Sequence, residues 1–331
     1  MAEGDDYTPA PWAAQHDFKS ARASYDRNAG RSYADAQAKN VTASDLVPES
    51  IATKSKHPLL IWCDTTGSMG GWPGVMFSKI PYLDHEMRTE YLGEDAEVSF
   101  GSITDTGDEY PLQVRPFVQG EGLKTSLEKL VLAGGGSGPG TYCESYAVAA
   151  LYACRNVKFP KAAGKPTLII IGDEMPYDLV SRSDAKTFAK VDIEETRLSA
   201  DAIFKELTEK YSVYLILKPY GGESLTGDEL RGVTKDVYER WEKILGARRI
   251  AFLPTADRVV DVIFGILAKE ADKVAYFREE IEGRQRPDQV ETVYKSLLTV
   301  HAEDPAPKPK PGASTMHKPA GGKRSKGLLD K

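Results

Sequence analysis

Short apolar runs of strand length recur along the middle of the chain, separated by polar turns and by helical patterns. Residues 59–63 (LLIWC) and 168–171 (LIII) are uninterrupted apolar runs. Such runs are typical of strands that are buried on both faces of a sheet. The expected strands are residues 59–63, 97–103, 112–117, 167–171, 213–217 and 250–253.

Between these runs, apolar residues return every three or four positions, which is the spacing of one face of an α-helix. Met76, Ile80, Leu83 and Met87 form the first such pattern, and Pro81 within it predicts a kink. Because strands and helices alternate, we expect an α/β fold with a doubly wound, mostly parallel sheet flanked by helices. The other expected helices are residues 123–132, 144–155, 200–211, 228–245 and one long helix over 259–281.

This pattern divides the chain into four parts. Residues 1–54 are polar and lack a sustained period, which predicts an N-terminal arm, either flexible or laid over the domain by its aromatic side chains. Residues 55–255 carry the α/β pattern, and residues 256–300 are expected to be a C-terminal helical extension. Residues 301–331 are rich in Pro, Gly and Lys, which predicts a disordered tail.

Composition narrows the class of protein. The 331 residues are 41% hydrophobic, enough for a substantial core, and the formal net charge of -6 argues against a basic nucleic-acid binder. The 3 cysteines make a poor disulfide framework and favour a reducing compartment. The first residues lack the apolar stretch of a secretory signal, and no run reaches the ~18 apolar residues of a membrane span. We therefore expect a cytoplasmic protein that contacts neither nucleic acid nor membrane.

The sequence IWCDTTGSMGG at residues 61–71 carries the clearest chemistry. An apolar strand delivers Asp64 at its carboxyl end, and the hydroxyl residues Thr66 and Ser68 follow two and four positions later. In open α/β sheets, ligands bind outside the carboxyl ends of the strands. One carboxylate and two hydroxyls on a tight turn make an oxygen-only site, which suits Mg²⁺ or Mn²⁺.

The pattern D-x-T-x-S at residues 64–68 resembles the D-x-S-x-S signature of the metal-ion-dependent adhesion site (MIDAS) in von Willebrand factor A (vWA) domains, with Thr replacing the first Ser. Those domains take a third hydroxyl from a glycine-rich loop that enters a helix, and residues 134–141 (GGGSGPGT) are similar. That loop offers both Ser137 and Thr141, and we favour Thr141 because it lies just before the expected helix. The resemblance covers about residues 55–255 and implies a Rossmann-like vWA fold.

The same resemblance implies a second carboxylate after a later buried strand. Asp173 follows such a strand, and the adjacent Glu174 is the alternative ligand. Residues 100–114 (FGSITDTGDEYPLQV) are similar to an intracellular bacterial and phage branch of the family, in which a strand-end Asp lies near the metal loop. Asp105 is therefore expected beside the site. Two further segments fit the same branch, GDEMPY at residues 172–177 and CESYAVAALY at residues 143–152.

The resemblance implies binding rather than catalysis. In related domains the protein ligands leave one metal position open, and an Asp or Glu carboxylate of a partner protein fills it. The expected function is therefore a protein–protein interaction module that depends on Mg²⁺ or Mn²⁺ and has no enzymatic activity. Related intracellular domains often act in multi-protein assemblies beside AAA+ ATPases, and because this sequence has no Walker A motif, such an ATPase would be a separate chain. The expected metal ligands are Asp64, Thr66, Ser68, Thr141 and Asp173.

An enzymatic alternative stays open on the same residues. Haloacid-dehalogenase-like phosphohydrolases also place a nucleophilic Asp at a strand end, and DTTGS is similar to the D-K-T-G-T loop of P-type ATPases. In that hypothesis Asp64 attacks phosphorus, and Mg²⁺ bridges Asp64 and Asp173. Lys165 neutralises the phosphoryl oxygens, and Asp178 completes the acidic motif. We rank this hypothesis second, because Thr66 stands where most soluble members have a general acid and the glycine loop would have no role.

Overall fold

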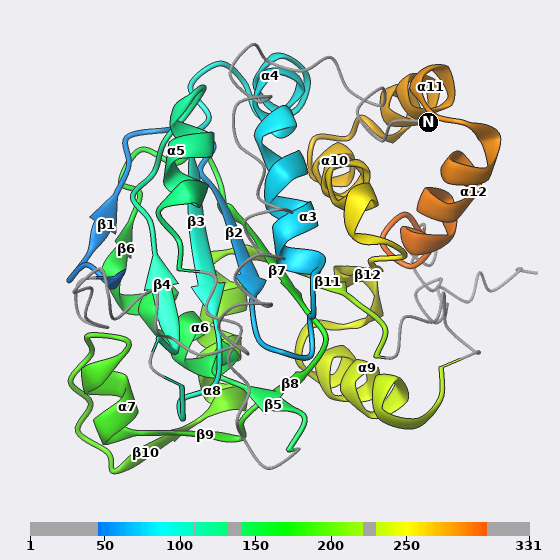
Figure 1. The fold of residues 1–331 in the computed structure, drawn as a ribbon. Helices are drawn as coiled ribbons and strands as arrows, with labels where there is room; N and C mark the ends of the chain where they lie inside the picture. Colours follow the sequence, from blue (N-terminus) through cyan, green and yellow to red (C-terminus); the bar gives the residue numbers. More distant parts are fainter. Residues whose placement is uncertain (1–45, 109, 132–140, 221–229, 303–331) are drawn as a thin grey trace, which may run out of the picture.

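A six-stranded sheet forms the centre of the computed structural model, which describes residues 46–108, 110–131, 141–220 and 230–302. The strand order is β12-β11-β7-β2-β3-β4, and every neighbouring pair is parallel except β3 and β4, as Figure 1 shows. The prediction of a mostly parallel sheet flanked by helices is confirmed. The strands are β2 (Leu59–Asp64), β3 (Val98–Ile103), β4 (Leu112–Val114), β7 (Thr167–Gly172), β11 (Ser212–Leu217) and β12 (Ile250–Phe252).

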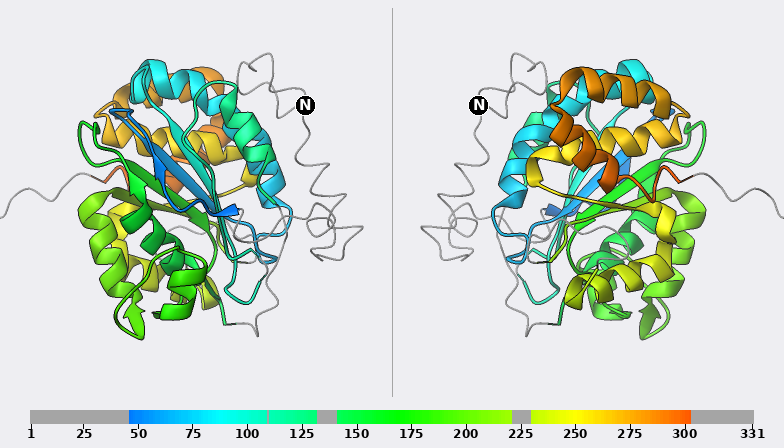
Figure 2. Two further views of the ribbon diagram at one scale, coloured as in Figure 1. Left: turned by 90° about the vertical axis from the view of Figure 1, so that its left-hand side faces the viewer. Right: turned by 90° about the vertical axis from the view of Figure 1, so that its right-hand side faces the viewer.

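The central strands are buried on both faces, as their continuous apolar runs predicted. In β2, Leu59, Ile61 and Cys63 belong to one hydrophobic cluster, whereas Leu60 and Trp62 belong to a second cluster on the opposite face. All five side chains are at most 1% exposed. Burying each large apolar side chain contributes about 1.5–3 kcal/mol, so these strands anchor both layers of helices. Figure 2 shows the sheet lying between those two layers.

The segment after β2 is helical but broken, because Pro81 lies inside it. Proline has no backbone N–H, and its ring clashes with the preceding turn of an α-helix. The kink predicted at Pro81 is therefore confirmed. The segment consists of α3 (Trp72–Lys79), a 3₁₀ turn (Ile80–Tyr82), α4 (Leu83–Glu86) and a π-helical turn (Met87–Tyr91).

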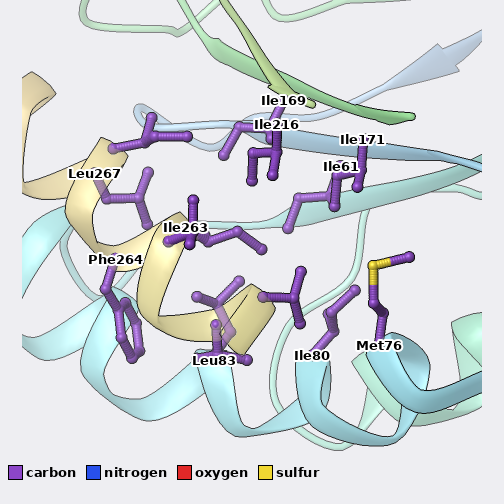
Figure 3. Packing of buried hydrophobic residues seen from close by; sticks show 14 of the residues in the cluster. Ile61, Met76, Ile80, Leu83, Ile169, Ile171, Ile216, Ile263, Phe264 and Leu267 are labelled. Carbon is purple, nitrogen blue, oxygen red and sulfur yellow. The ribbon is translucent and has the colours of Figure 1, made fainter. Parts of the chain in front are cut away.

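Helix α10 (Val259–Glu270) packs beside this broken segment, on the same face of the sheet. Figure 3 shows Ile263 and Leu267 of α10 close to Ile80 and Leu83, with Ile169 of β7 above them. Helix α5 (Gly122–Glu128) adds its apolar residues to the same cluster. The first face of the sheet is thus covered by helices from the first half of the chain and from its end.

The second face is covered by helices from the middle of the chain, which surround the second cluster. They are α6 (Tyr146–Asn156), α7 (Arg182–Thr187), α8 (Ala200–Lys210) and α9 (Gly232–Leu245). Three two-stranded pairings, which the sequence pattern did not predict, tie the loops of this half together. They are β1 (Ile51–Ala52) with β6 (Val157–Lys158), β5 (Cys143–Glu144) with β8 (Met175–Pro176), and β9 (Leu179–Ser181) with β10 (Arg197–Ser199).

The prediction of one long helix over residues 259–281 is wrong. The chain ends α10 at Glu270 and begins α11 (Val274–Arg284) after a tight turn. Asp272 in that turn has a φ of 56°, in the left-handed region, which cannot continue a right-handed helix. The turn folds α11 back, so that Phe277 and Ile281 are buried in the same cluster as α10.

The region predicted as a C-terminal extension also contains α12 (Pro287–Ser296), which the pattern analysis missed. Proline at the first position of a helix and an acidic residue in its first turn are start signals, and Pro287 and Asp288 provide them. Residues of α10, α11 and α12 share one hydrophobic cluster with the sheet. The domain limits proposed at residues 54, 255 and 300 stay predictions.

Several sequence predictions lie outside the described residues. Most of the predicted arm (residues 1–45), Glu109, residues 132–140 and 221–229, and the tail from residue 303 belong to this group. Ser137 is therefore among them. Within the described ranges, no helix has both the length and the apolar character needed to cross a membrane.

Replacing Gly265 of α10 with Ala tests the packing of the chain after α12. A methyl group there would overlap the buried Leu297 side chain, so we expect Gly265→Ala to destabilise the protein by about 1–3 kcal/mol in urea unfolding. Gly283→Ala in α11 is the matched control, because its methyl group meets no atom within 4 Å, and it should stabilise by about 0.5–1 kcal/mol. Equal stabilisation by both substitutions would mean that Leu297 does not pack against α10.

Candidate metal centre

The carboxyl end of β2 delivers Asp64 into a fully buried position, with 0% of the residue exposed. The chain then turns back over the carboxylate. Asp64 Oδ1 accepts hydrogen bonds from the backbone N–H of Thr66 at 2.8 Å and from the Thr66 hydroxyl at 2.6 Å. This local geometry follows from the sequence, because an Asp carboxylate can accept a hydrogen bond from the backbone N–H two residues later and so close an Asx turn, to which the Thr66 hydroxyl adds a second donor.

The same loop reaches the neighbouring strand β7. Thr66 Oγ1 lies 2.9 Å from Ser68 Oγ, which donates to Asp173 Oδ1 at 2.9 Å. Asp173 directly follows β7 and is 1% exposed. Four of the predicted ligands therefore form one continuous hydrogen-bonded series, Asp64 Oδ1, Thr66 Oγ1, Ser68 Oγ and Asp173 Oδ1, which we call the oxygen chain.

The oxygen chain has the chemistry and spacing of a site for a small hard cation. Successive oxygens lie between 2.6 and 2.9 Å apart. Adjacent oxygens around octahedral Mg²⁺ are about 2.9 Å apart, given metal–oxygen distances of about 2.0–2.1 Å. Among the described residues, no group of three His, Cys, Asp or Glu side chains is placed to hold a metal. The oxygen chain has two carboxylates and two hydroxyls, so it is a different kind of donor set.

A lysine lies directly against the oxygen chain. Lys218 follows β11, and its Nζ donates to Asp173 Oδ2 at 2.8 Å and to the Ser68 carbonyl at 3.2 Å. Its side chain is 7% exposed, and the partner carboxylate is 0% exposed. The rings of Trp72 and Tyr220 have their centroids 5.4 and 5.8 Å from the ammonium. The centre therefore contains a buried positive charge of its own.

The second oxygen of Asp64 is held from the other side of the sheet. The Tyr146 hydroxyl, at the start of α6, donates to Asp64 Oδ2 at 2.6 Å. Gly172 at the end of β7 makes this approach possible, because any side chain there would overlap the Tyr146 hydroxyl and crowd Asp64 Cβ. A glycine at this strand end is thus a packing requirement of the centre.

Burial and mutual repulsion raise the pKa of three carboxyl groups at the centre. Burial, and then the charge of Asp173, raise the pKa of Asp64 to about 7. The same two causes, in the same order, raise the pKa of Glu174 to about 7. Burial, followed by Asp64, raises the pKa of Glu144 to about 12, and Glu144 Oε2 makes no hydrogen bond to any described residue. A cation would favour the charged forms of these groups.

The remaining predicted residues lie at the rim of the centre. Thr141 is exposed, and its hydroxyl lies 3.4 Å from the Tyr177 hydroxyl rather than in the oxygen chain. The Tyr177 hydroxyl donates to Asp105 Oδ2 at 2.5 Å, so Asp105 lies near the centre without joining the oxygen chain. Glu174 is 8% exposed and interacts with Ser68, so the choice between Asp173 and Glu174 stays open.

Sequence reasoning missed three residues of the centre, namely Tyr146, Lys218 and Glu144. For Lys218 a signal was present, because it immediately follows a buried strand, and ligands gather at the carboxyl ends of such strands. Tyr146 and Glu144 sit at the entry to an expected helix, next to the predicted metal loop. Nothing in their spacing indicates that they turn toward Asp64.

The geometry gives little support to the phosphohydrolase alternative. Lys165 precedes β7, and its ammonium donates to the Thr208 carbonyl. It therefore lies at the opposite end of β7 from Asp173, and this six-residue strand alone is about 20 Å long at ~3.3 Å per residue. The Asp178 side chain is 86% exposed and pairs with Arg240 at 3.1 Å. Neither residue reaches the oxygen chain.

Comparisons with known proteins leave the family open. No family model and no curated protein matches the chain. The pilus adhesin SpaC from Lactobacillus rhamnosus GG is similar in structure, with a TM-score of 0.45 and 10% identity over 70% of this chain and 31% of that one. Proximal thread matrix protein 1 from the mussel byssus gives a TM-score of 0.40 and 10% identity over 68% of this chain and 48% of that one. The chain thus spans less than half of either protein, and likeness at this level identifies no family.

A double-mutant cycle tests the bond between Tyr146 and Asp64. We expect Tyr146→Phe to lower the free energy of unfolding by about 1–2 kcal/mol, because Asp64 Oδ2 loses its buried donor. Combined with Asp64→Asn, the loss should be non-additive by about 1 kcal/mol. Tyr152→Phe is the control on the same helix, since its hydroxyl donates to the Pro48 carbonyl, and its effect should add to that of Asp64→Asn. Additive losses for Tyr146 and Asp64 would contradict the geometry.

Proposed function

We propose that this chain is a vWA-like domain of the intracellular bacterial or phage type, acting as a divalent-metal-dependent protein–protein interaction module. In this proposal the mostly parallel sheet and its flanking helices form the doubly wound, Rossmann-like vWA fold. Asp64, Thr66, Ser68 and Asp173 hold Mg²⁺ or Mn²⁺ in a MIDAS-type centre, and Thr141 at the rim is the candidate for a third hydroxyl. A partner protein supplies an Asp or Glu carboxylate, within a multi-protein assembly whose ATPase, if of the AAA+ class, is a separate chain.

The observation that carries this proposal is the oxygen chain itself. Its members come from two adjacent strand ends, β2 and β7, and they meet through hydrogen bonds of 2.6–2.9 Å. Two carboxylates would only just balance the charge of a divalent ion. Because Asp173 already pairs with Lys218, the centre would carry a net positive charge once the ion is bound. Such a centre favours an additional anionic ligand.

A divalent ion bound here supplies an electrophilic position for a carboxylate oxygen. The residues of the chain do the rest. Thr66 and Ser68 offer neutral oxygens and so preserve positive charge at the centre, whereas Tyr146 fixes the orientation of the Asp64 carboxylate. The buried setting excludes water from the inner side, so a ligand can approach only from the rim.

The rim offers contact area that a carboxylate alone cannot provide. Tyr142 is 37% exposed and packs edge-on against Tyr220, with ring centroids 5.4 Å apart. Next to Tyr177 lies a pocket of about 470 Å³, with Met175 and Leu179 among its lining residues. Aromatic and apolar surfaces of this kind are enriched where proteins bind one another. A partner segment with an acidic residue beside apolar residues suits this rim.

Calorimetric titration with Mn²⁺ tests the proposal. We expect one binding site in the wild type, lost in Asp64→Asn and weakened at least tenfold in Thr66→Ala, because each substitution removes a ligand of the oxygen chain. Asp178→Ala is the matched acidic control, since its exposed side chain lies outside the oxygen chain, and it should bind Mn²⁺ as the wild type does. Circular dichroism of each variant shows whether it is folded.

Phosphate release from a generic phosphoester, measured on the same samples, separates the two hypotheses. The interaction module should release none above background. Phosphate release that depends on both Asp64 and Asp178 would favour the phosphohydrolase hypothesis over the interaction module. Absence of Mn²⁺ binding in the folded wild type and in all variants would count against a metal-dependent module.

A further inference from the structure

Lys218 lies where its positive charge opposes the binding of a metal ion, and this opposition points to a function. Its ammonium contacts Asp173 at 2.8 Å and the Ser68 carbonyl at 3.2 Å, so it touches two of the four residues of the oxygen chain. Lys218 and Asp173 are 6% and 1% exposed. Charges separated from water are screened little, so an ammonium here repels any cation that shares the Asp173 carboxylate.

We propose that Lys218 is an internal counter-ion of the centre, which a divalent ion must displace from Asp173 before it can bind. The inference rests on the proposed metal site and adds its regulation. In the metal-free state, the ammonium neutralises Asp173 and ties the loop after β2 to the end of β11. Metal binding is then an exchange of one cation for another, and Lys218 sets the metal concentration at which the exchange occurs.

The surroundings of Lys218 allow it to leave Asp173 without losing all favourable contacts. The ammonium lies over the rings of Trp72 and Tyr220, 5.4 and 5.8 Å from their centroids. Both residues are only partly buried, and cation–π contacts are worth about 0.5–2 kcal/mol. The ammonium can therefore turn toward the rim and stay stabilised there while the carboxylate accepts another cation.

A purely structural ion pair would behave differently, which makes the inference testable. Removing one partner of a buried pair leaves the other charge without compensation. If Lys218 only supported the fold, its loss would destabilise the protein equally with and without metal. If it competes with the metal, its loss destabilises the metal-free protein and strengthens metal binding by the same linkage.

The experiment compares the wild type with Lys218→Met, a substitution of similar length without charge. In Mn²⁺ calorimetry, we expect the dissociation constant of Lys218→Met to fall at least about tenfold below that of the wild type. The melting temperature of the variant should be lower than that of the wild type in chelator, and the difference should shrink in excess Mg²⁺. The full-length chain is used throughout.

Lys210→Met is the matched control. Lys210 is also a partly buried lysine, but its ammonium donates to the carbonyls of Ala153, Cys154 and Val157 at the end of α6, far from the oxygen chain in sequence and contacts. We expect this variant to lose stability equally in chelator and in Mg²⁺, with the Mn²⁺ affinity of the wild type.

The quenching or shift of tryptophan emission gives an independent reading of the exchange. Because the Lys218 ammonium faces the Trp72 ring, Mg²⁺ should change the emission of the wild type. The change should be lost in Trp72→Phe and reduced in Lys218→Met, whose side chain carries no ammonium to move.

The results of the Mn²⁺ titrations distinguish failure of the counter-ion inference from failure of the proposed metal-dependent function. Tighter Mn²⁺ binding by Lys218→Met supports the inference, and so does binding by the variant where the wild type shows none. If the wild type binds Mn²⁺ and Lys218→Met binds it no more tightly, the counter-ion inference is overturned while the metal-dependent function stands. If neither protein binds Mn²⁺, both are overturned.

Discussion

The pairing of two buried carboxylates at neighbouring strand ends is the constraint around which the rest of the centre is built. Parallel strands β2 and β7 lie in register, so Asp64 and Asp173 necessarily emerge at one edge of the sheet. Like charges out of contact with water repel strongly. The surrounding groups reduce that repulsion. The Thr66 hydroxyl donates a hydrogen bond to one oxygen of Asp64, Tyr146 donates to the other oxygen, and Lys218 pairs its positive charge with Asp173.

Strand β2 meets this constraint by staying apolar up to its last residue. Side chains of β2 alternate between two hydrophobic clusters as far as Cys63, and polar chemistry begins with Asp64. This abrupt change concentrates the polar groups at one end of a rigid scaffold, which is where precise positioning is available at low entropic cost. Because Gly172 has no side chain, β7 can end close to α6, and Tyr146 at the start of α6 can donate to the Asp64 carboxylate.

Local sequence was sufficient to predict the six strands of the central sheet and the loop members Asp64, Thr66 and Ser68 of the oxygen chain, because these depend on short-range features, whereas Asp173 was expected from the resemblance to vWA domains. Period and polarity locate strand ends, and a D-x-T-x-S loop brings its own oxygens together. Contacts made across the fold were not predictable in this way. Tyr146 and Lys218 reach the centre from α6 and β11, and only the tertiary structure specifies their direction. The helix break at Asp272 was missed for a related reason, since the apolar spacing continues through it and packing of α11 decides the turn.

The broken helix after the Asp64–Ser68 loop has a mechanical consequence. Trp72, which faces Lys218, is the first residue of α3, so a change in the loop pulls on the start of this segment. An unbroken helix would act as a lever and carry such a pull as one rigid movement. Here the 3₁₀ turn at Ile80–Tyr82 and the π-helical turn at Met87–Tyr91 introduce two points of compliance. A segment divided in this way need not move as one rigid body when its first turn shifts.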